Sequence, residues 1–420
     1  SDCGYTRHGL ADILRLEAIV KGEPTMAAMQ MGARAPGQQG KRTRVKYILS
    51  IDKLTQLSEA ERTALKEVAR RYAFRTNDYY LGLIDWSDPH DPIRRLVIPA
   101  VGELRQWGHL DASREGKVTV RKGVQHKYSS TVLLLVNEVC GSFCRYCFRK
   151  RLFMNGNDEA AYDIRPGIEY LRTRPEVNNV LLSGGDPMIL STPQLDGILT
   201  ALRSIAHIRI IRIGSKMPAF NPYRFLDDDE LFAMLRRHSQ PDRRIYLVCH
   251  FDHPRELTPE AREAVRRAIE AGLICVNQNP IIRGVSDDPE VMAELWNELS
   301  YMGIPQYYVF QGRPTAGNEP YEVPLVEAYC SIERAKRKCS GLAKRIKFCM
   351  SHESGKVEII GVDHRHVYLK YHRAKHYRDE QRLLVCHRND QAYWLDQLKP
   401  VEGYRNEYYS DQGLRLYGFS

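Results

Sequence analysis

The sequence has no hydrophobic run approaching the roughly eighteen residues that a membrane-spanning helix needs, and 27% of its residues are charged. Its first residues, 1–4, carry neither the basic nor the apolar stretch of a secretory leader. Ten cysteines among 420 residues are too sparse for the disulfide framework of a small secreted domain. No short internal repeat is evident. We therefore expect a cytoplasmic globular protein without membrane contact.

Acidic residues are in the minority, 52 against 62 basic residues, which gives a net charge of +10. Such an excess favours anionic ligands, and several anionic cofactors would account for it as well as a nucleic acid would. The Gly-rich, basic segment 33–46 has the composition of a nucleic-acid arm, but a solvated or partner-binding loop is the better interpretation. We expect no nucleic-acid partner.

Three cysteines, Cys140, Cys144 and Cys147, fall within eight residues. Thiolates are soft ligands that select iron–sulfur clusters, zinc or copper(I). A structural zinc site has four ligands, but the next cysteine along the chain is Cys249. Three thiolates on a [4Fe–4S] cluster leave one iron open to bind a substrate. The apolar run 131–138 predicts a buried strand, so the triplet lies on the loop at its end.

Beyond the cysteines, strand-like runs alternate with helical patterns such as 195–205 and 259–271. Together with the strand predicted at 131–138, five further strand-like runs make six β/α repeats. This alternation implies a parallel sheet. We therefore predict an α/β fold with an incomplete (β/α)6 barrel, whose site lies at the C-terminal ends of the strands. The remaining strand candidates are 180–183, 208–213, 245–250, 273–278 and 306–311.

Three regions are expected: a mostly helical one at 1–120, the barrel at 121–325, and a C-terminal extension at 326–420. In the first region, apolar spacing predicts a helix over 54–71, and Ser58 opens a cap-like motif.

The C-x3-C-x2-C spacing on a strand-end loop resembles the radical S-adenosylmethionine (SAM) superfamily. The resemblance implies that the open iron binds the amino and carboxylate groups of SAM. It also implies that one electron, from a donor such as flavodoxin or ferredoxin, cleaves SAM to a 5′-deoxyadenosyl radical. A zinc knuckle and chance clustering are the competing interpretations of the triplet.

The segment 77–99 resembles the stretch before the barrel in the lysine 2,3-aminomutase family, and the likeness extends over roughly residues 45–360. Four segments at strand ends match that family in order and spacing, namely 181–186, 212–216, 250–254 and 277–284. By this resemblance, the SAM-binding residues are Gly184, Gly185, Asp186, Ser215, His250 and Gln278.

The same resemblance implies pyridoxal 5′-phosphate (PLP) as a further cofactor. Lys356 matches the family lysine that forms an aldimine with PLP, although the glycine-rich run before it is reduced here to Gly355. Lys127 and Tyr128 match a basic–aromatic pair near the cofactor's phosphate and ring. A second family arginine, four residues beyond the basic member of this pair, is Thr131 in this chain.

Two arginines are expected to bind the substrate. Arg149 matches the arginine that binds the α-carboxylate, and a guanidinium fork suits a carboxylate. Its neighbours Lys150 and Arg151 are expected to be a solvated basic run. The lysine enzymes bind the distal ammonium with one aspartate where this chain has Arg313, and with another where it has Cys349. A cation in place of an anion favours an acidic, glutamate-like substrate.

We therefore predict a PLP-dependent radical SAM 2,3-aminomutase that converts an α-amino acid into a β-amino acid, with Lys356, Arg149 and Arg313 as catalytic residues. Lysine, free or on a translation factor, is an alternative substrate. A dehydratase or deaminase on the same scaffold would also fit these motifs, and so would a non-enzymatic iron–sulfur protein. Homo-oligomerisation is left open. No zinc is predicted, because the family's C-terminal zinc ligands are absent and Cys386 stands alone there.

Overall fold

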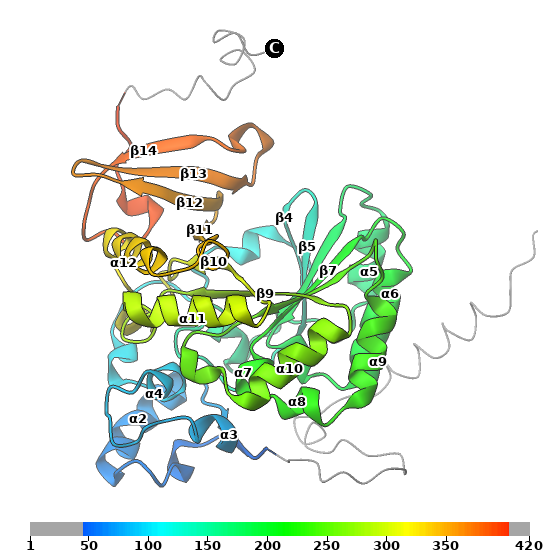
Figure 1. Ribbon diagram of the computed structural model, residues 1–420, viewed down its shortest axis with the longest axis horizontal. Helices are drawn as coiled ribbons and strands as arrows, with labels where there is room; N and C mark the ends of the chain where they lie inside the picture. Colours follow the sequence, from blue (N-terminus) through cyan, green and yellow to red (C-terminus); the bar gives the residue numbers. More distant parts are fainter. Residues whose placement is uncertain (1–44, 403–420) are drawn as a thin grey trace, which may run out of the picture.

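The computed structural model describes residues 45–402. Within that range the chain builds one twelve-stranded sheet, with helices packed along it, and a two-stranded pair of β1 (Tyr47–Ile48) and β2 (Thr76–Asn77) (Figure 1). The helical stretch expected before residue 45, and nearly all of the basic segment 33–46, lie outside the described residues.

Each strand of the large sheet pairs with the strands before and after it in the sequence, in the order β14-β13-β12-β11-β10-β9-β8-β7-β6-β5-β4-β3. Strands β5 to β11 run parallel, and the strands at both edges are antiparallel. The strands are β3 (Thr119–Arg121), β4 (Val124–Tyr128), β5 (Thr131–Asn137), β6 (Asn179–Gly184), β7 (Ile210–Ser215), β8 (Ile245–Cys249), β9 (Ile274–Pro280), β10 (Gln306–Phe310), β11 (Lys347–His352), β12 (Gly355–Val362), β13 (His366–Ala374) and β14 (Leu383–His387).

The six predicted strands are confirmed as β5 to β10, and the chain is an α/β protein with a large, mostly parallel sheet. Because the strands are parallel, each connection between them must cross back along the sheet, and helices make these crossings. Among residues 45–402 no pairing joins β3 to β14, so the sheet does not close on itself.

The helices between these strands cover the sheet (Figure 1). In α6, the hydroxyl of the N-cap Ser191 accepts the backbone N–H of Gln194, whose side chain accepts the Ser191 N–H in return. Leu195, Leu199 and Leu202 repeat at helical spacing and are fully buried in the core. The helices are α5 (Arg165–Arg172), α6 (Thr192–Arg203), α7 (Met217–Phe220), α8 (Tyr223–Leu226), α9 (Asp229–His238), α10 (Pro259–Glu270), α11 (Pro289–Tyr301) and α12 (Leu325–Arg337).

The N-terminal part packs against loops at the C-terminal ends of the parallel strands. The helix predicted over 54–71 is α2 (Glu59–Arg71), and Ser58 forms the expected capping box with Glu61. The apolar face of α2 packs with α3 (Asp78–Leu81) and α4 (Pro92–Val97) in a second apolar cluster. That cluster also takes in three side chains beyond the strand ends, namely Tyr146 and Ile282 from loops and Phe220 from α7.

The sheet continues past the six predicted strands. β11 pairs in parallel with β10, which brings Cys349 opposite Phe310, and β12 to β14 extend the sheet in antiparallel fashion. This extension stands at the end of the sheet in Figure 1. No helix among the described residues is long and apolar enough to span a membrane.

Candidate active site

The predicted site residues gather at one edge of the sheet, because the C-terminal ends of parallel strands all lie on the same side. The cysteine loop follows β5, Gly184 ends β6 and Ser215 ends β7. His250 comes directly after β8, and Gln278 lies within β9. The sheet therefore brings together residues from five separate parts of the chain.

The cysteine loop is fastened to the N-terminal part by main-chain contacts. Arg75 donates from Nε to the carbonyl oxygen of Cys140 over 2.8 Å, and its own carbonyl accepts the N–H of Phe143 over 2.8 Å. Between the second and third cysteines, buried Arg145 binds both carboxylate oxygens of buried Glu103, at 2.7 and 3.0 Å. These contacts tie the cysteine loop to the N-terminal part independently of the thiols.

The three cysteines are free, half-buried and mutually close. Burial raises the pKa of all three thiols, and the neighbouring cysteines raise the pKa of Cys140 and Cys144 further. Among residues 45–402, no three His, Cys, Asp or Glu side chains converge as ligands of a single metal ion. In a [4Fe–4S] cluster each thiolate binds a different iron. Cys140, Cys144 and Cys147 fit such a cluster, because its charge would let three adjacent thiols ionise together.

The loop after β6 passes very close to the main chain that leads to the cysteines. Gly184 has φ +118°, and a Cβ on it would lie 2.3 Å from the carbonyl oxygen of Asn137. A Cβ on Gly185 would lie 2.3 Å from the carbonyl oxygen of Val139. Both positions therefore require glycine, which fits the function expected of this loop as a close backbone surface.

Asp186 ties the same loop to the end of β7. Its buried carboxylate accepts the Ser215 hydroxyl at 3.0 Å and the backbone N–H groups of Lys216 and Met217 at 2.7 and 3.1 Å. Burial raises its pKa to about 6, against the effect of these hydrogen bonds. Asp186 and Ser215 therefore shape the loops. The side chain of Gln278 makes no hydrogen bond within residues 45–402 and is free to contact a ligand.

His250 belongs to a buried polar network beneath the cysteine loop. Tyr146, which lies between two of the cysteines, donates to Asp252 over 2.5 Å and contacts Nε2 of His250 at 3.0 Å. Nζ of Lys216 lies 2.6 Å from Asp252 and 2.6 Å from Glu256. Burial alone would lower the pKa of Lys216, but these two carboxylates raise it above its ordinary value. The network links the cysteine loop to the ends of β7 and β8.

Lys356 is enclosed near the start of β12. Its Nζ lies 3.7 Å from the centre of the Tyr308 ring and 5.2 Å from that of Phe310. Burial lowers its pKa to about 7, and the charges of Arg212 and Arg373 act in the same direction. A lowered pKa of this kind leaves a large share of the amine neutral near pH 7, and the neutral amine is the nucleophile that a pyridoxal carbonyl requires.

Lys127 and Tyr128 end β4 close to this lysine. Lys127 donates from Nζ to the backbone carbonyl of His352, and its charge contributes to the lowered pKa of Lys356. Burial lowers the pKa of Lys127 to about 8 and raises that of Tyr128 to about 12. With Lys356 they supply a nucleophile, an aromatic side chain and a cation. These are the groups that hold PLP, so this set of side chains fits the cofactor.

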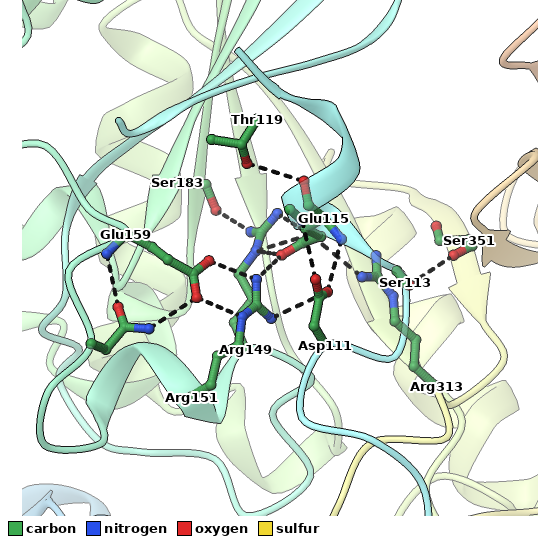
Figure 2. Close-up of polar contacts among 12 residues, drawn as sticks. Asp111, Ser113, Glu115, Thr119, Arg149, Arg151, Glu159, Ser183, Arg313 and Ser351 are labelled. Carbon is green, nitrogen blue, oxygen red and sulfur yellow. Dashed lines mark hydrogen bonds and ion pairs between the residues drawn. The ribbon is translucent and has the colours of Figure 1, made fainter. Parts of the chain in front are cut away.

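Arg149 and Arg313 meet at a buried carboxylate, that of Glu115 (Figure 2). Arg149 donates from Nε and Nη2 at 3.0 and 2.8 Å, and from Nη1 to the Ser183 hydroxyl at 2.9 Å. Arg151 reaches the same carboxylate at 2.7 Å, and Arg313 lies 3.5 Å from it. Burial would raise the pKa of Glu115, but these guanidinium groups hold it well below its usual range.

The expectation that Lys150 and Arg151 are solvated is wrong. Both are buried, because the short turn that begins at Lys150 directs them under the loop, where Arg151 also pairs with Glu159 at 2.8 Å. Arg313 is enclosed as well, with its guanidinium 3.6 Å from the centre of the Phe148 ring. Burial lowers its pKa to about 10. Arg313 therefore faces the site.

Four residues of this site were not predicted from the sequence. Glu115 lies in a turn without regular periodicity, and Arg373 lies in the tail that matches the family poorly. Arg212 stands in a matching motif, donates from Nε to Asn179 at 2.9 Å, and contributes to the lowered pKa of Lys356. Asp252 also lies in a matching motif, between two histidines. The matching motifs could therefore have indicated Arg212 and Asp252, but not Glu115 and Arg373.

No protein-family profile matches the chain. A protein of Aquifex aeolicus (strain VF5) named "Putative L-lysine 2,3-aminomutase" is 50% identical to it over 354 residues, which are 84% of this chain and 95% of that protein. The L-lysine 2,3-aminomutase of Fusobacterium nucleatum is 34% identical over 305 residues, 72% of this chain and 70% of its own. The glutamate 2,3-aminomutase of Clostridioides difficile (strain 630) is 29% identical over 302 residues, 71% and 70% of the two chains.

Proposed function

Because the chain belongs to the lysine 2,3-aminomutase family of radical SAM enzymes, we propose that it moves the amino group of a free, acidic α-amino acid from the α-carbon to the β-carbon. Glutamate is the expected substrate. The observation that carries this proposal is the position of half-buried Arg313, which shares the Glu115 carboxylate with Arg149, where the lysine enzymes are expected to have an aspartate. Two neighbouring guanidinium groups suit a substrate with two carboxylates.

Enzymes of this family use a [4Fe–4S] cluster, SAM and PLP. The cysteine triplet would hold the cluster, the loop 184–186 with His250 and Gln278 would hold SAM, and Lys356 would hold PLP. When bound, these groups supply a hydrogen-abstracting radical and a conjugated ring that carries the migrating nitrogen. Burial lowers the pKa of Lys356 to about 7, so that much of its amine is neutral near pH 7 and able to form a bond. The N-terminal part lies over the strand ends, where it helps to exclude water from the reacting groups.

The charge of the pocket supports an acidic substrate. Lys127, Arg212 and Arg373 form no ion pair with any acidic side chain in residues 45–402. The carboxylate beside Arg313 is that of Glu115, which two other arginines already bind. A phosphate, an α-carboxylate and a second carboxylate would all be favoured here, whereas a distal ammonium would be repelled.

Lysine is the second candidate, because the relatives at 50% and 34% identity bear lysine names and the glutamate enzyme is 29% identical. One acidic group could pair with the distal ammonium of a lysine substrate. Buried Glu322 has an Oε2 atom without a hydrogen-bond partner in residues 45–402. Burial raises the pKa of Glu322 well above its usual range, and Lys150 is the charge beside it. A neutral carboxyl next to a lysine attracts an ammonium weakly, so glutamate remains our proposal.

We further propose that β5 to β10 and their helices form an incomplete (β/α)6 barrel within residues 121–325, flanked by an N-terminal region at 1–120 and an extension at 326–420. The parallel strand order and the position of the site at the strand ends support this. A flavodoxin or ferredoxin would reduce the cluster, and the net charge of +10 suits an acidic donor of that kind.

The test is anaerobic turnover of lysine and glutamate by the reconstituted protein, with products identified by mass spectrometry. Leaving a buried charge unpaired costs roughly 3–5 kcal/mol, which is about two to three and a half decades in rate. Wild type should therefore prefer glutamate strongly. Arg313→Asp should lower glutamate turnover far more than SAM cleavage, whereas Arg105→Asp, at a side chain that is 69% exposed, should change neither. Preference of wild type for lysine, or an unchanged preference in Arg313→Asp, would overturn the substrate assignment.

A further inference from the structure

Arg373 belongs to β13 in the C-terminal extension, and its side chain extends towards the residues proposed to hold PLP. Its Nη1 donates to the Thr131 hydroxyl over 3.0 Å, and its Nη2 donates to the Ser130 hydroxyl over 2.6 Å. The guanidinium lies 4.6 Å from the centre of the Tyr128 ring. Residues 128–131 form the tight turn from β4 into β5, so one side chain of β13 holds this whole turn.

Arg373 is also the cross-strand partner of Lys356 in the antiparallel pair of β12 and β13. Directly opposite residues project from the same face of a sheet, with Cβ atoms about 4.5–5.5 Å apart. The charge of Arg373 contributes to the lowered pKa of Lys356, as expected for neighbours on one face. In pyridoxal phosphate, the carbonyl and the phosphate arm are carried on adjacent ring carbons. The two side chains are therefore spaced to contact both arms of one such ring.

The donors around this turn lack an acidic partner. Arg373 donates to two hydroxyls and Lys127 to a backbone carbonyl, and neither forms an ion pair within residues 45–402. A guanidinium, an ammonium and two hydroxyls form a donor set suited to a phosphate dianion. The two hydroxyl contacts also hold the guanidinium in position before any ligand arrives, which lowers the entropic cost of binding.

We propose that Arg373, with the hydroxyls of Ser130 and Thr131, binds the phosphate of PLP. The guanidinium that the family resemblance assigns to position 131 would come in this chain from β13, where sequence matching does not find it. This assignment rests on the proposed function, because the phosphate is that of its cofactor.

The experiment compares equilibrium binding of PLP and of pyridoxal, which lacks the phosphate, to the full-length apoprotein by absorbance titration. Wild type should bind PLP more tightly than pyridoxal. Hydrogen bonds to a charged group justify a loss of roughly tenfold to a hundredfold in PLP affinity for Arg373→Ala. Its pyridoxal affinity should stay near that of wild type. Arg388→Ala, at a surface arginine paired with Asp390, is the matched control and should leave both affinities unchanged.

The double variant Thr131→Arg/Arg373→Ala should recover the preference for PLP, because it returns a guanidinium to the same turn. Inorganic phosphate should compete with PLP on wild type and much less on Arg373→Ala. Equal weakening of PLP and pyridoxal by Arg373→Ala, or an unchanged preference, would refute the assignment while leaving the proposed function intact. Should Arg373→Ala not fold, the absence of phosphate competition on wild type would refute it in the same way. If the wild-type protein bound neither PLP nor pyridoxal, the proposed function itself would be refuted.

Discussion

Arg149 binds Glu115 through two N–H groups, and both side chains are buried. The same carboxylate meets Arg151 and Arg313 (Figure 2). Three guanidinium groups this close would repel one another without a shared anion. Glu115 therefore positions the arginines that we propose for the substrate, and it does so without occupying all of their donors.

Glu115→Gln should destabilise the fold, because it leaves buried arginines without their counter-charge. Breaking a buried pair costs about 3–5 kcal/mol, which denaturant unfolding at equilibrium would resolve. Glu159→Gln is the matched control, since that side chain is 35% exposed and its loss should cost about 1 kcal/mol or less. Equal effects of the two substitutions would contradict the central position of Glu115.

Replacement of any one of Cys140, Cys144 and Cys147 by alanine should abolish binding of the cluster. We expect loss of its visible absorbance, a fall in bound iron, and no cleavage of SAM under reducing conditions. Cys330→Ala, at a half-buried cysteine of α12, should retain all three properties. A triplet variant with both absorbance and 5′-deoxyadenosine production would disprove the ligand assignment.

Lys356 should be the residue that PLP modifies, and its reactivity should follow its lowered pKa. The neutral amine is the reactive form, so the rate of adduct formation should rise with pH and level off above about 7. An ordinary lysine would continue to gain reactivity towards its pKa of about 10.4. Borohydride trapping and peptide mapping across a pH series give the measurement.

Lys356→Met should yield no trapped adduct, whereas Lys347→Met should behave as wild type because Lys347 is paired with Glu358 on the neighbouring strand. Label on a different lysine of fully loaded protein would show that Lys356 was misassigned.

Gly184→Ala should weaken SAM binding and destabilise the protein. The added Cβ would meet the Asn137 carbonyl at 2.3 Å, and φ of +118° is unfavourable for alanine, so a cost of roughly 1–3 kcal/mol is expected. Gly197→Ala offers the opposite case, since no atom lies within 4 Å of the added Cβ in α6. It should stabilise the helix by about 0.5–1 kcal/mol. Melting temperatures and SAM titration would distinguish the two.

The sequence predicted those parts of the site that depend on local patterns. The cysteine spacing, the strand before it and the Ser58 capping box are contained within short windows, and the structure has the strand and the capping box as expected. Lys356 was predicted because a short motif marks it, and its lowered pKa suits the function proposed for it.

The burial of Arg151 and the position of Arg373 could not be predicted, because both depend on contacts between distant segments. Arg151 looked like a surface cation until Glu115, from a turn before β3, gave it a buried partner. Arg373 reaches the turn at Thr131 only because β13 pairs with β12, which extends the sheet beyond β11. Neither partner is marked by periodicity or spacing in the sequence.

The attachment of the cysteine loop to Arg75 has a consequence for how the enzyme is assembled. In a zinc finger the metal and the fold arrive together, since the apo chain is unfolded. Here the carbonyl of Cys140 and the N–H of Phe143 are already engaged by one N-terminal residue, whatever the thiols bind. These hydrogen bonds do not involve the thiols, so we expect them to help position the loop for cluster insertion. Protein purified without iron should accept a cluster without being unfolded first.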